Sequence, residues 1–274
     1  MRLEAFPFAR RHPRHALEEV GELRGVKCAL SDVVNQYPVL SWNAADAAVS
    51  AVEISSSLRS NGVYAAVATL TDTSLTAWTN ETARTTAVGE PVFYKVAFKG
   101  TLNGVAFAAT SEPVAYRKCR KLTGTVVVDD AGGGTYDGRT RDKSLELAFD
   151  GDPATWPDLT DPAKVGIDLG ADCYIAFVRV LPRADEYSTR LAGVAAFASS
   201  QANLTDGVQF TGAVGTPAVG RYETLASTDG YTRARSVYVA KQAGDESEFI
   251  GNVAEVEVWG CRADYARPLM IVVR

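Results

Sequence analysis

The stretch Val253-Ala254-Glu255-Val256-Glu257-Val258-Trp259 is a short run rich in valine that ends on an aromatic residue. This composition predicts a β-strand. Similar runs follow one another from Val26 onward, separated by turn residues about every 8–12 positions, which is typical of β-sandwiches and barrels. The other clear runs are Val39–Trp42, Ala51–Ile54, Tyr64–Leu70, Val92–Phe98, Val105–Ala109, Thr125–Val128, Lys164–Leu169, Ile175–Leu181, Gly193–Ala198 and Ser236–Ala240.

The sequence therefore predicts an all-β protein with few helices, because no segment after the N-terminal arm keeps a helical apolar period for three turns. A length of 274 residues suggests about two domains. The short basic stretch Arg117-Lys118-Cys119-Arg120-Lys121 separates two strand-rich blocks. We predict an arm or linker over 1–25, a first sandwich over 26–117, a second over 121–262 and a C-terminal tail over 263–274.

Composition argues against several functional classes. The chain has a net charge of −5, whereas a dedicated nucleic-acid binder normally shows a basic face. No stretch approaches the roughly 18–20 consecutive apolar residues of a membrane span. No signal peptide is visible in this sequence, because the first residues lack a charged start followed by an apolar run.

Histidine usage argues against most catalytic chemistry. The two histidines, His12 and His15, both lie in a short basic stretch of the N-terminal arm. The rest of the chain therefore has no histidine for a Ser-His-Asp triad, a zinc site or a general base. The carboxylate pairs Asp129-Asp130 and Asp185-Glu186 are adjacent residues whose side chains would diverge along a strand. We predict that the protein is not an enzyme.

The first block contains several short motifs in a characteristic order: Leu40-Ser41-Trp42, Val52–Ser55, Val63–Leu70, Thr73-Ser74, Trp78-Thr79-Asn80 and the run from Gly89 to Ala97. In these residues it resembles a fibronectin type III domain. This resemblance implies an immunoglobulin-like sandwich of two sheets with interdigitating inward residues. Trp42 would fill its centre, and the ring of Tyr94 would pack between the sheets. No adhesive tripeptide is recognisable, so we expect this block to be a spacer.

Four stretches of the second block form an ordered set within about 140 residues. They are Ala148–Trp156, Val165–Gly170, Val178–Arg183 with Arg190–Gly193 and Ala198–Ser200 after it, and Ile250–Gly260. In these stretches the block resembles a discoidin, or coagulation-factor C-type, domain, whose jelly roll is shared by family 32 carbohydrate-binding modules. The implied fold is a galactose-binding-like jelly roll.

This resemblance implies a structural calcium site. In the family, an Asp-Gly-Asp-x-x-Thr turn and a glutamate near the last strand supply the oxygen ligands that calcium prefers. Carried over, they are the Asp152 carboxylate, Thr155 and Glu255, with main-chain carbonyls near Phe149 and Ala254. The alternative is an ordinary Asp-Gly turn with Glu255 solvated on an exposed strand face.

The resemblance also implies a sugar site, with Arg183 bonding a hydroxyl and Tyr187 stacking on the pyranose. Arg190 and Tyr136 are further candidate ligand residues, and Tyr231 is a candidate rim aromatic, whereas Trp156 is expected to pack under the calcium turn. Ser188 or Thr189 stands where the family has an asparagine, and the frequent histidine of galactose sites has no counterpart. The alternative role for Arg183 is structural, bonding loop carbonyls.

Of the four cysteines, Cys119 precedes the second block and Cys261 follows it. Related discoidin domains often join their two ends by a disulfide at such positions, so the resemblance implies a Cys119–Cys261 bond in an oxidising compartment. The alternative is that all four cysteines are reduced. No Cys-x-x-Cys spacing suggests zinc or redox chemistry.

Together these observations predict a non-catalytic protein that binds a glycan or cell-surface glycoconjugate. It would act at the cell surface or outside the cell, beside other domains of a larger carbohydrate-active assembly. The alternative is a structural or protein–protein adhesion module with the same fold and no sugar site. A fold of this kind does not settle the choice.

Overall fold

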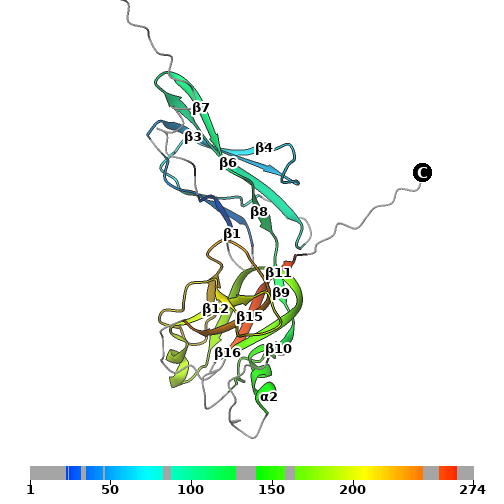
Figure 1. Cartoon of the computed structure of the whole chain (residues 1–274). Coiled ribbons are helices and arrows are strands. Elements are labelled where there is room, and N and C mark those ends of the chain that lie inside the picture. The colour runs from blue at the N-terminus through cyan, green and yellow to red at the C-terminus, as the bar shows by residue number, and fades with distance from the viewer. Residues whose placement is uncertain are drawn as a thin grey trace, which may run out of the picture. The chain divides into compact units, whose positions relative to one another are not determined.

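The computed structural model describes residues 23, 25–31, 35–45, 47–82, 88–127, 140–157, 164–242 and 253–263. In these residues nearly all regular structure is antiparallel β-strand, which confirms the predicted all-β class (Figure 1). The chain divides into two compact units: Met1–Ala83 with Pro91–Tyr116, and Arg84–Glu90 with Arg117–Arg274. No helix in the described part is long and apolar enough to cross a membrane.

The first unit is a sandwich of two antiparallel sheets. Three strands form one sheet in the order β1-β2-β5: β1 (Lys27–Leu30), β2 (Pro38–Ser41) and β5 (Ala77–Thr79). The second sheet has the order β4-β3-β6-β7, with β8 paired to β6. Its strands are β4 (Ala65–Leu70), β3 (Val49–Ser57), β6 (Pro91–Leu102), β7 (Val105–Thr110) and β8 (Val114–Arg117).

Two large rings occupy the core of the first unit, as the resemblance implied. Trp42 is buried and donates its indole N–H to the Leu75 carbonyl at 3.0 Å. Tyr94 is also buried, and its hydroxyl accepts a hydrogen bond from the Asn80 side chain at 3.2 Å. Each polar atom thereby keeps a partner inside an apolar interior. Membership of the fibronectin type III family stays a prediction.

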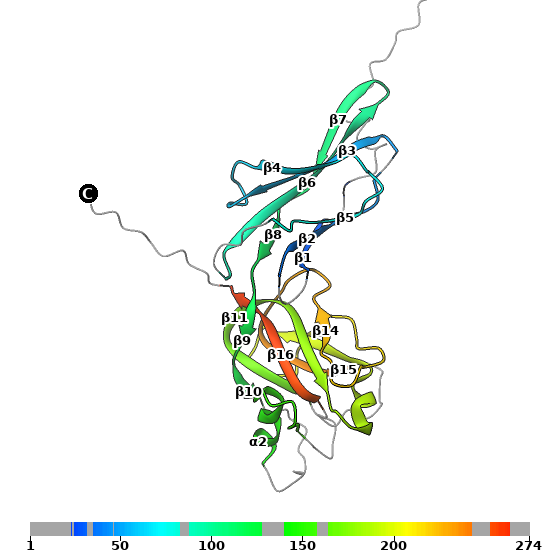
Figure 2. The same cartoon turned by 180° about the vertical axis from the view of Figure 1, so that it is seen from behind.

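The second unit is built around one long strand, β11 (Val165–Pro182) (Figures 1 and 2). Its first half pairs with β10 and β15, and its second half pairs with β14 and β16. Beyond these, β12 and β13 extend the ladder from β15, and β9 pairs with β16. The other strands are β9 (Arg120–Leu122), β10 (Thr125–Val127), β12 (Val194–Ser199), β13 (Val208–Gln209), β14 (Glu223–Ala226), β15 (Thr232–Lys241) and β16 (Val253–Arg262).

The β11 strand bends where its register shifts, between Asp168 and Cys173. Gly170 has φ +74° there, a conformation that glycine adopts without the strain a side chain adds. A bulge of this kind lets one strand pass from one layer to the next. The two strands predicted on either side of this bend are thus one continuous element. Core residues from both halves, such as Ile167 and Val178, pack into the same apolar cluster.

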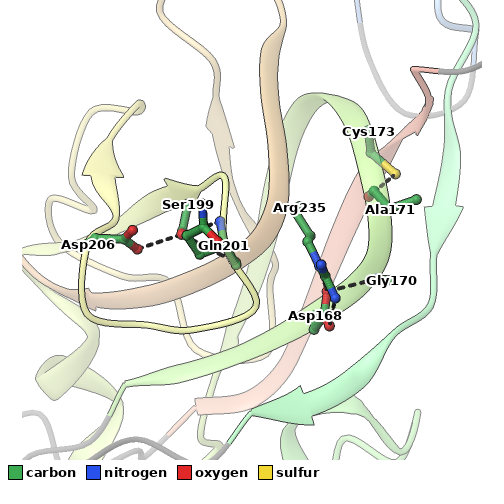
Figure 3. A network of polar contacts seen from close by, with 8 residues as sticks. All are labelled: Asp168, Gly170, Ala171, Cys173, Ser199, Gln201, Asp206 and Arg235. Atoms are coloured by element: carbon green, nitrogen blue, oxygen red, sulfur yellow. Dashed lines mark hydrogen bonds and ion pairs between the residues drawn. The ribbon is translucent and has the colours of Figure 1, made fainter.

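An ion pair holds the bend from outside the core (Figure 3). The Asp168 carboxylate accepts hydrogen bonds from Arg235 Nε at 3.0 Å, Arg235 Nη2 at 3.1 Å and the Gly170 N–H at 2.9 Å. The Arg235 guanidinium is the main reason why the pKa of Asp168 lies below its usual range. Because every oxygen of this carboxylate is engaged, the contact is structural.

A second group in the same view closes the loop after β12. The Ser199 hydroxyl donates to the Asp206 carboxylate at 2.6 Å and accepts from the Gln201 N–H at 2.9 Å (Figure 3). The buried serine thus joins two ends of one loop, which is again a structural role.

Short helices complete the second unit, in keeping with the prediction of few helices. They are α2 (Arg141–Glu146) and the 3-10 turns η1 (Leu147–Phe149) and η2 (Glu186–Leu191). Leu145 and Ala148 are fully buried in the apolar cluster. This burial sets η1 against β16, so the turn that follows η1 lies over the last strand.

Candidate functional site

The turn Asp150–Thr155 gathers several oxygen atoms. Gly151 has φ +84°, which lets the chain reverse between the two aspartates. Asp150 Oδ1 accepts the Asp152 N–H at 2.8 Å. The Thr155 hydroxyl lies 2.8 Å from Asp150 Oδ2 and 3.0 Å from the Asp152 carbonyl oxygen. A carboxylate, a carbonyl and a hydroxyl oxygen therefore meet at one side of the turn.

Glu255 on β16 lies under this turn and is only 1% exposed. It alternates along the strand with the core residue Val256, so it points away from the main apolar cluster. No described residue makes a well-formed hydrogen bond to either of its carboxylate oxygens. A buried carboxylate without well-formed hydrogen bonds is costly, and it is the arrangement that a bound cation would complete.

Burial and a hydrogen bond with the nearby Asp150 carboxyl together raise the pKa of Glu255 to about 7. The Gly151 N–H opposes the shift. Two carboxylates that share a site disfavour each other's charged form. Burial and the Asp150 carboxyl therefore both oppose ionisation of Glu255. A positive charge between them would remove this repulsion.

The pKa of Glu255 predicts a pH dependence for the protein held metal-free by a chelator. Its folded pKa of about 7 lies above the ordinary 4.5, so protonation favours the folded state. Stability is then highest below about pH 4.5 and falls as the pH rises to about 7, by up to about 3 kcal/mol for this one group. Denaturant melts at several pH values measure this slope. Glu255→Gln should flatten it, and an unchanged slope in that variant would contradict the assignment.

The predicted metal residues come together in part. Thr155 and Glu255 both contact Asp150, with Phe149 at the end of η1 and the buried Ala254 beside Glu255. The Asp152 carboxylate instead accepts the Ala154 N–H at 3.0 Å, while its carbonyl faces Thr155. The carboxylate that faces Glu255 is that of Asp150, which our sequence reasoning missed. The pattern Asp-Gly-Asp offers two carboxylates, and only the turn conformation distinguishes them.

A second group of residues lies next to this turn: Trp156, Arg183, Tyr187 and Arg190, here called the arginine–aromatic cluster. The Arg183 Cζ atom lies 4.3 Å from the Trp156 ring centroid and 5.1 Å from that of Tyr187. The Arg190 Cζ atom lies 4.2 Å from the Tyr187 ring centroid. Two guanidinium groups and two aromatic rings thus lie within the distance of cation–π interactions.

Local structure explains how these side chains are positioned. Arg183 directly follows β11, is 6% exposed and pairs with the Asp185 carboxylate at 2.5 Å. The other oxygen of Asp185 accepts the Tyr187 N–H at 3.1 Å and so begins η2. This helical turn presents Tyr187, which is 40% exposed, and carries Arg190 in its last turn. Ser188, near the family's asparagine position, is buried.

The turn and the arginine–aromatic cluster occupy the same end of the second unit. Thr155 of the turn and Trp156 of the cluster are consecutive residues. In the ladder between β11 and β16, Glu255 pairs with Leu181, two residues before Arg183. The Glu255 site and the cluster are therefore joined by neighbouring segments of backbone.

The remaining candidate aromatics have other positions. Tyr136 lies outside the described residues. The Tyr231 hydroxyl accepts the Arg117 N–H at 2.8 Å and donates to the Arg117 carbonyl at 2.7 Å. It therefore binds the backbone of Arg117, the first residue of the segment Arg117–Arg274 of the second unit. Trp156 was expected to pack under the turn, but its ring faces Arg183.

Glu257, two residues beyond Glu255 on the same face of β16, has a contrasting environment. Its carboxylate contacts Arg179 at 2.8 Å and Lys121 at 3.3 Å, and it accepts the Trp259 indole N–H at 3.0 Å. These contacts hold the pKa of Glu257 below its usual range, against the opposing effect of burial. Neighbouring side chains of the protein therefore supply the positive charge and the hydrogen bonds that the Glu257 carboxylate needs.

All four cysteines lie in the described residues, are buried and are thiols, so the implied disulfide is not formed. The implied pair nevertheless lies together, because the Cys119 and Cys261 thiols are hydrogen-bonded to each other. They stand one residue beyond the register pair Arg120–Gly260 of neighbouring strands β9 and β16. Joining them requires an oxidant, which the compartment supplies or withholds.

No family model matches the chain, and no curated protein matches it. Among solved structures it is similar to CBM62 from Clostridium thermocellum Xyl5A, with 26% identity, a TM-score of 0.43 and coverage of 53% of this chain and 99% of that one. It is also similar to the family 32 CBM from C. perfringens NanJ in complex with galactose, with 15% identity, a TM-score of 0.33 and coverage of 52% of this chain and 98% of that one. A SusE-like protein shows 11% identity and a TM-score of 0.48, with coverage of 90% of this chain and 98% of that one.

Proposed function

We propose that the second unit binds glycans without catalysis, at the arginine–aromatic cluster. The observation that carries this proposal is the convergence of Trp156, Arg183, Tyr187 and Arg190 at one partly exposed end of the sandwich. Aromatic rings and fixed hydrogen-bond donors are what a sugar ring requires of a binding surface. The similarity to two solved structures that are named as CBMs is in keeping with glycan binding.

Calcium is the second part of the proposal, in a structural role. The Asp150 and Glu255 carboxylates, the Thr155 hydroxyl and the Asp152 carbonyl form an all-oxygen set of the kind calcium takes. The support comes from Glu255, which is buried and receives no well-formed hydrogen bond from the described residues. Bound calcium would supply positive charge and fasten the turn to β16, beside the cluster.

The first unit acts as a spacer in this proposal, and the protein works at the cell surface or outside the cell. Other domains of a carbohydrate-active assembly would be natural neighbours. The rival function is adhesion to another protein by a module with the same fold and no sugar site. It gains support from Arg183, whose ion pair with Asp185 also serves the local structure.

A glycan array with the folded full chain tests the proposal. We expect the wild-type protein to bind a defined subset of glycans, and Tyr187→Ala to weaken the best of these about tenfold, equivalent to about 1.4 kcal/mol. The matched control is Tyr64→Ala, because Tyr64 lies in the first unit and also has a cation over its ring, Lys95 at 4.7 Å. Absence of binding by folded wild-type protein would favour the adhesion module, whereas an equal loss in both variants would contradict the cluster as the binding site.

A further inference from the structure

We propose that Asp185 is a positioning residue of the glycan site, and that its carboxylate fixes the two aromatic rings that a sugar would contact. This role deepens the glycan-binding function proposed above and rests on it. Asp185 has no contact with the ligand in this role. It acts through the side chain of Arg183 and the backbone of Tyr187.

The two oxygens of the Asp185 carboxylate have different partners. Oδ2 lies 2.5 Å from Arg183 Nη2, and Oδ1 accepts the Tyr187 N–H at 3.1 Å. The second contact makes Asp185 the N-terminal cap of η2, with the extended backbone (φ −110°, ψ −171°) that a cap residue adopts. One side chain thereby joins the residue that follows β11 to the first turn of η2.

Arg183 links the two rings of the cluster. Its Cζ atom lies 4.3 Å from the Trp156 ring centroid and 5.1 Å from the Tyr187 ring centroid, so one guanidinium group contacts both. The Arg183 side chain is only 7% exposed and offers little surface to a ligand. Tyr187 is 40% exposed, and Trp156 is partly exposed. The rings are therefore the groups that a sugar would meet, and Arg183 sets the distance between them.

Fixing the rings before a ligand arrives lowers the entropic cost of binding. An arginine side chain has many rotamers, and a charge-assisted hydrogen bond to a carboxylate restricts them. The cap holds the helical turn that carries Tyr187. Rings that are already placed lose little further freedom when a sugar binds, so more of each contact appears as affinity. Their spacing also determines which sugars can contact both rings at once.

A purely structural role for Asp185 predicts a different outcome. In that case loss of the carboxylate would lower the melting temperature, because the cap and the ion pair both stabilise the fold. Protein that is still folded would nevertheless bind glycans as before. Affinity measured well below the melting temperature therefore distinguishes a positioning role from a structural one.

Asp185→Ser separates the two contacts, because serine still caps a helical turn but cannot form an ion pair with Arg183. The test measures binding of the full chain to an array of galactosides, glucans and mucin glycans, followed by titration of the best glycan. We expect Asp185→Ser to weaken that glycan about tenfold and to flatten the ranking of the others. Asp185→Ala also removes the cap, so it should weaken binding at least as much and speed hydrogen exchange of the Tyr187 N–H.

Asp172→Ser is the matched control. Asp172 lies 2.6 Å from Arg233 in the same unit, so this variant also removes one negative charge and one ion pair with an arginine. Its affinity and ranking of glycans should equal those of the wild-type protein. Unchanged affinity and ranking in Asp185→Ser, or an equal loss in Asp172→Ser, would overturn this inference while leaving glycan binding intact. Absence of binding by folded wild-type protein would overturn the proposed function itself.

Discussion

Calcium should raise the melting temperature of the wild-type protein, and Glu255→Gln should remove most of that increase. At a calcium concentration of about 1,000 times Kd, binding to the folded state alone stabilises it by about 4 kcal/mol. For a domain of this size, that corresponds to a shift of about 8–16 °C. The cause is the buried Glu255 carboxylate, whose pKa is raised by burial and by Asp150 and whose charge a cation would balance.

Thermal melts in calcium and in chelator measure this effect. Glu257→Gln is the matched control, since Glu257 lies on the same face of β16 but is neutralised by Arg179 and Lys121. It should lose some stability in both conditions and keep the full calcium shift. Asp150→Asn should reduce the calcium shift more than Asp152→Asn, because the Asp152 carboxylate is used within its own turn. A wild-type melting temperature that is the same in calcium and in chelator would rule out the calcium site.

Oxidation of Cys119 and Cys261 to a disulfide is the second large effect that we expect. The two thiols are already hydrogen-bonded across neighbouring strands, so little backbone movement is needed. The Cys119 thiol and the positive charge of Arg117 lower the pKa of Cys261, while the pKa of Cys119 is raised. Cys261 is therefore the thiol that ionises first and attacks the oxidant.

Incubation with oxidised glutathione should remove one hydrogen from each thiol and reduce the glutathione disulfide to two thiols. The bond closes a loop that spans the second unit, which in the chain-entropy model contributes about 4–5 kcal/mol. Intact mass and melting temperature before and after reduction report both changes. Cys261→Ser should prevent them, whereas Cys173→Ser, a buried cysteine of the same unit, should not. Four reactive thiols after oxidation would refute the pairing.

The sequence predicted most strands of the fold because their short β-branched and aromatic runs are local signals. It divided β11 into two strands, since Gly170 and Asp172 resemble a turn between Leu169 and Ile175. In the structure the ladder partners continue past this point, and the Asp168–Arg235 ion pair holds a bend instead. Pairing with β15 and β16, which lie far along the chain, makes β11 one continuous strand. No local sequence pattern indicates this pairing.

The candidate site shows the same division. Arg183, Tyr187 and Arg190 were predicted from a resemblance in one short segment, and η2 brings them together locally. The role of Trp156 could not be predicted, because its ring meets Arg183 only after η1 packs against β16.

By itself the sequence determined the all-β class, because short runs of β-branched and aromatic residues express it locally. The candidate calcium turn and the Cys119–Cys261 pair were implied by the resemblance to discoidin domains. Only the tertiary structure decided that Asp150 faces Glu255 and that guanidinium groups cover the aromatic rings of the arginine–aromatic cluster. These are contacts between side chains whose positions depend on the bend of β11 and the packing of η1. They set the charge from which the calcium site is inferred and the surface at which glycan binding is proposed.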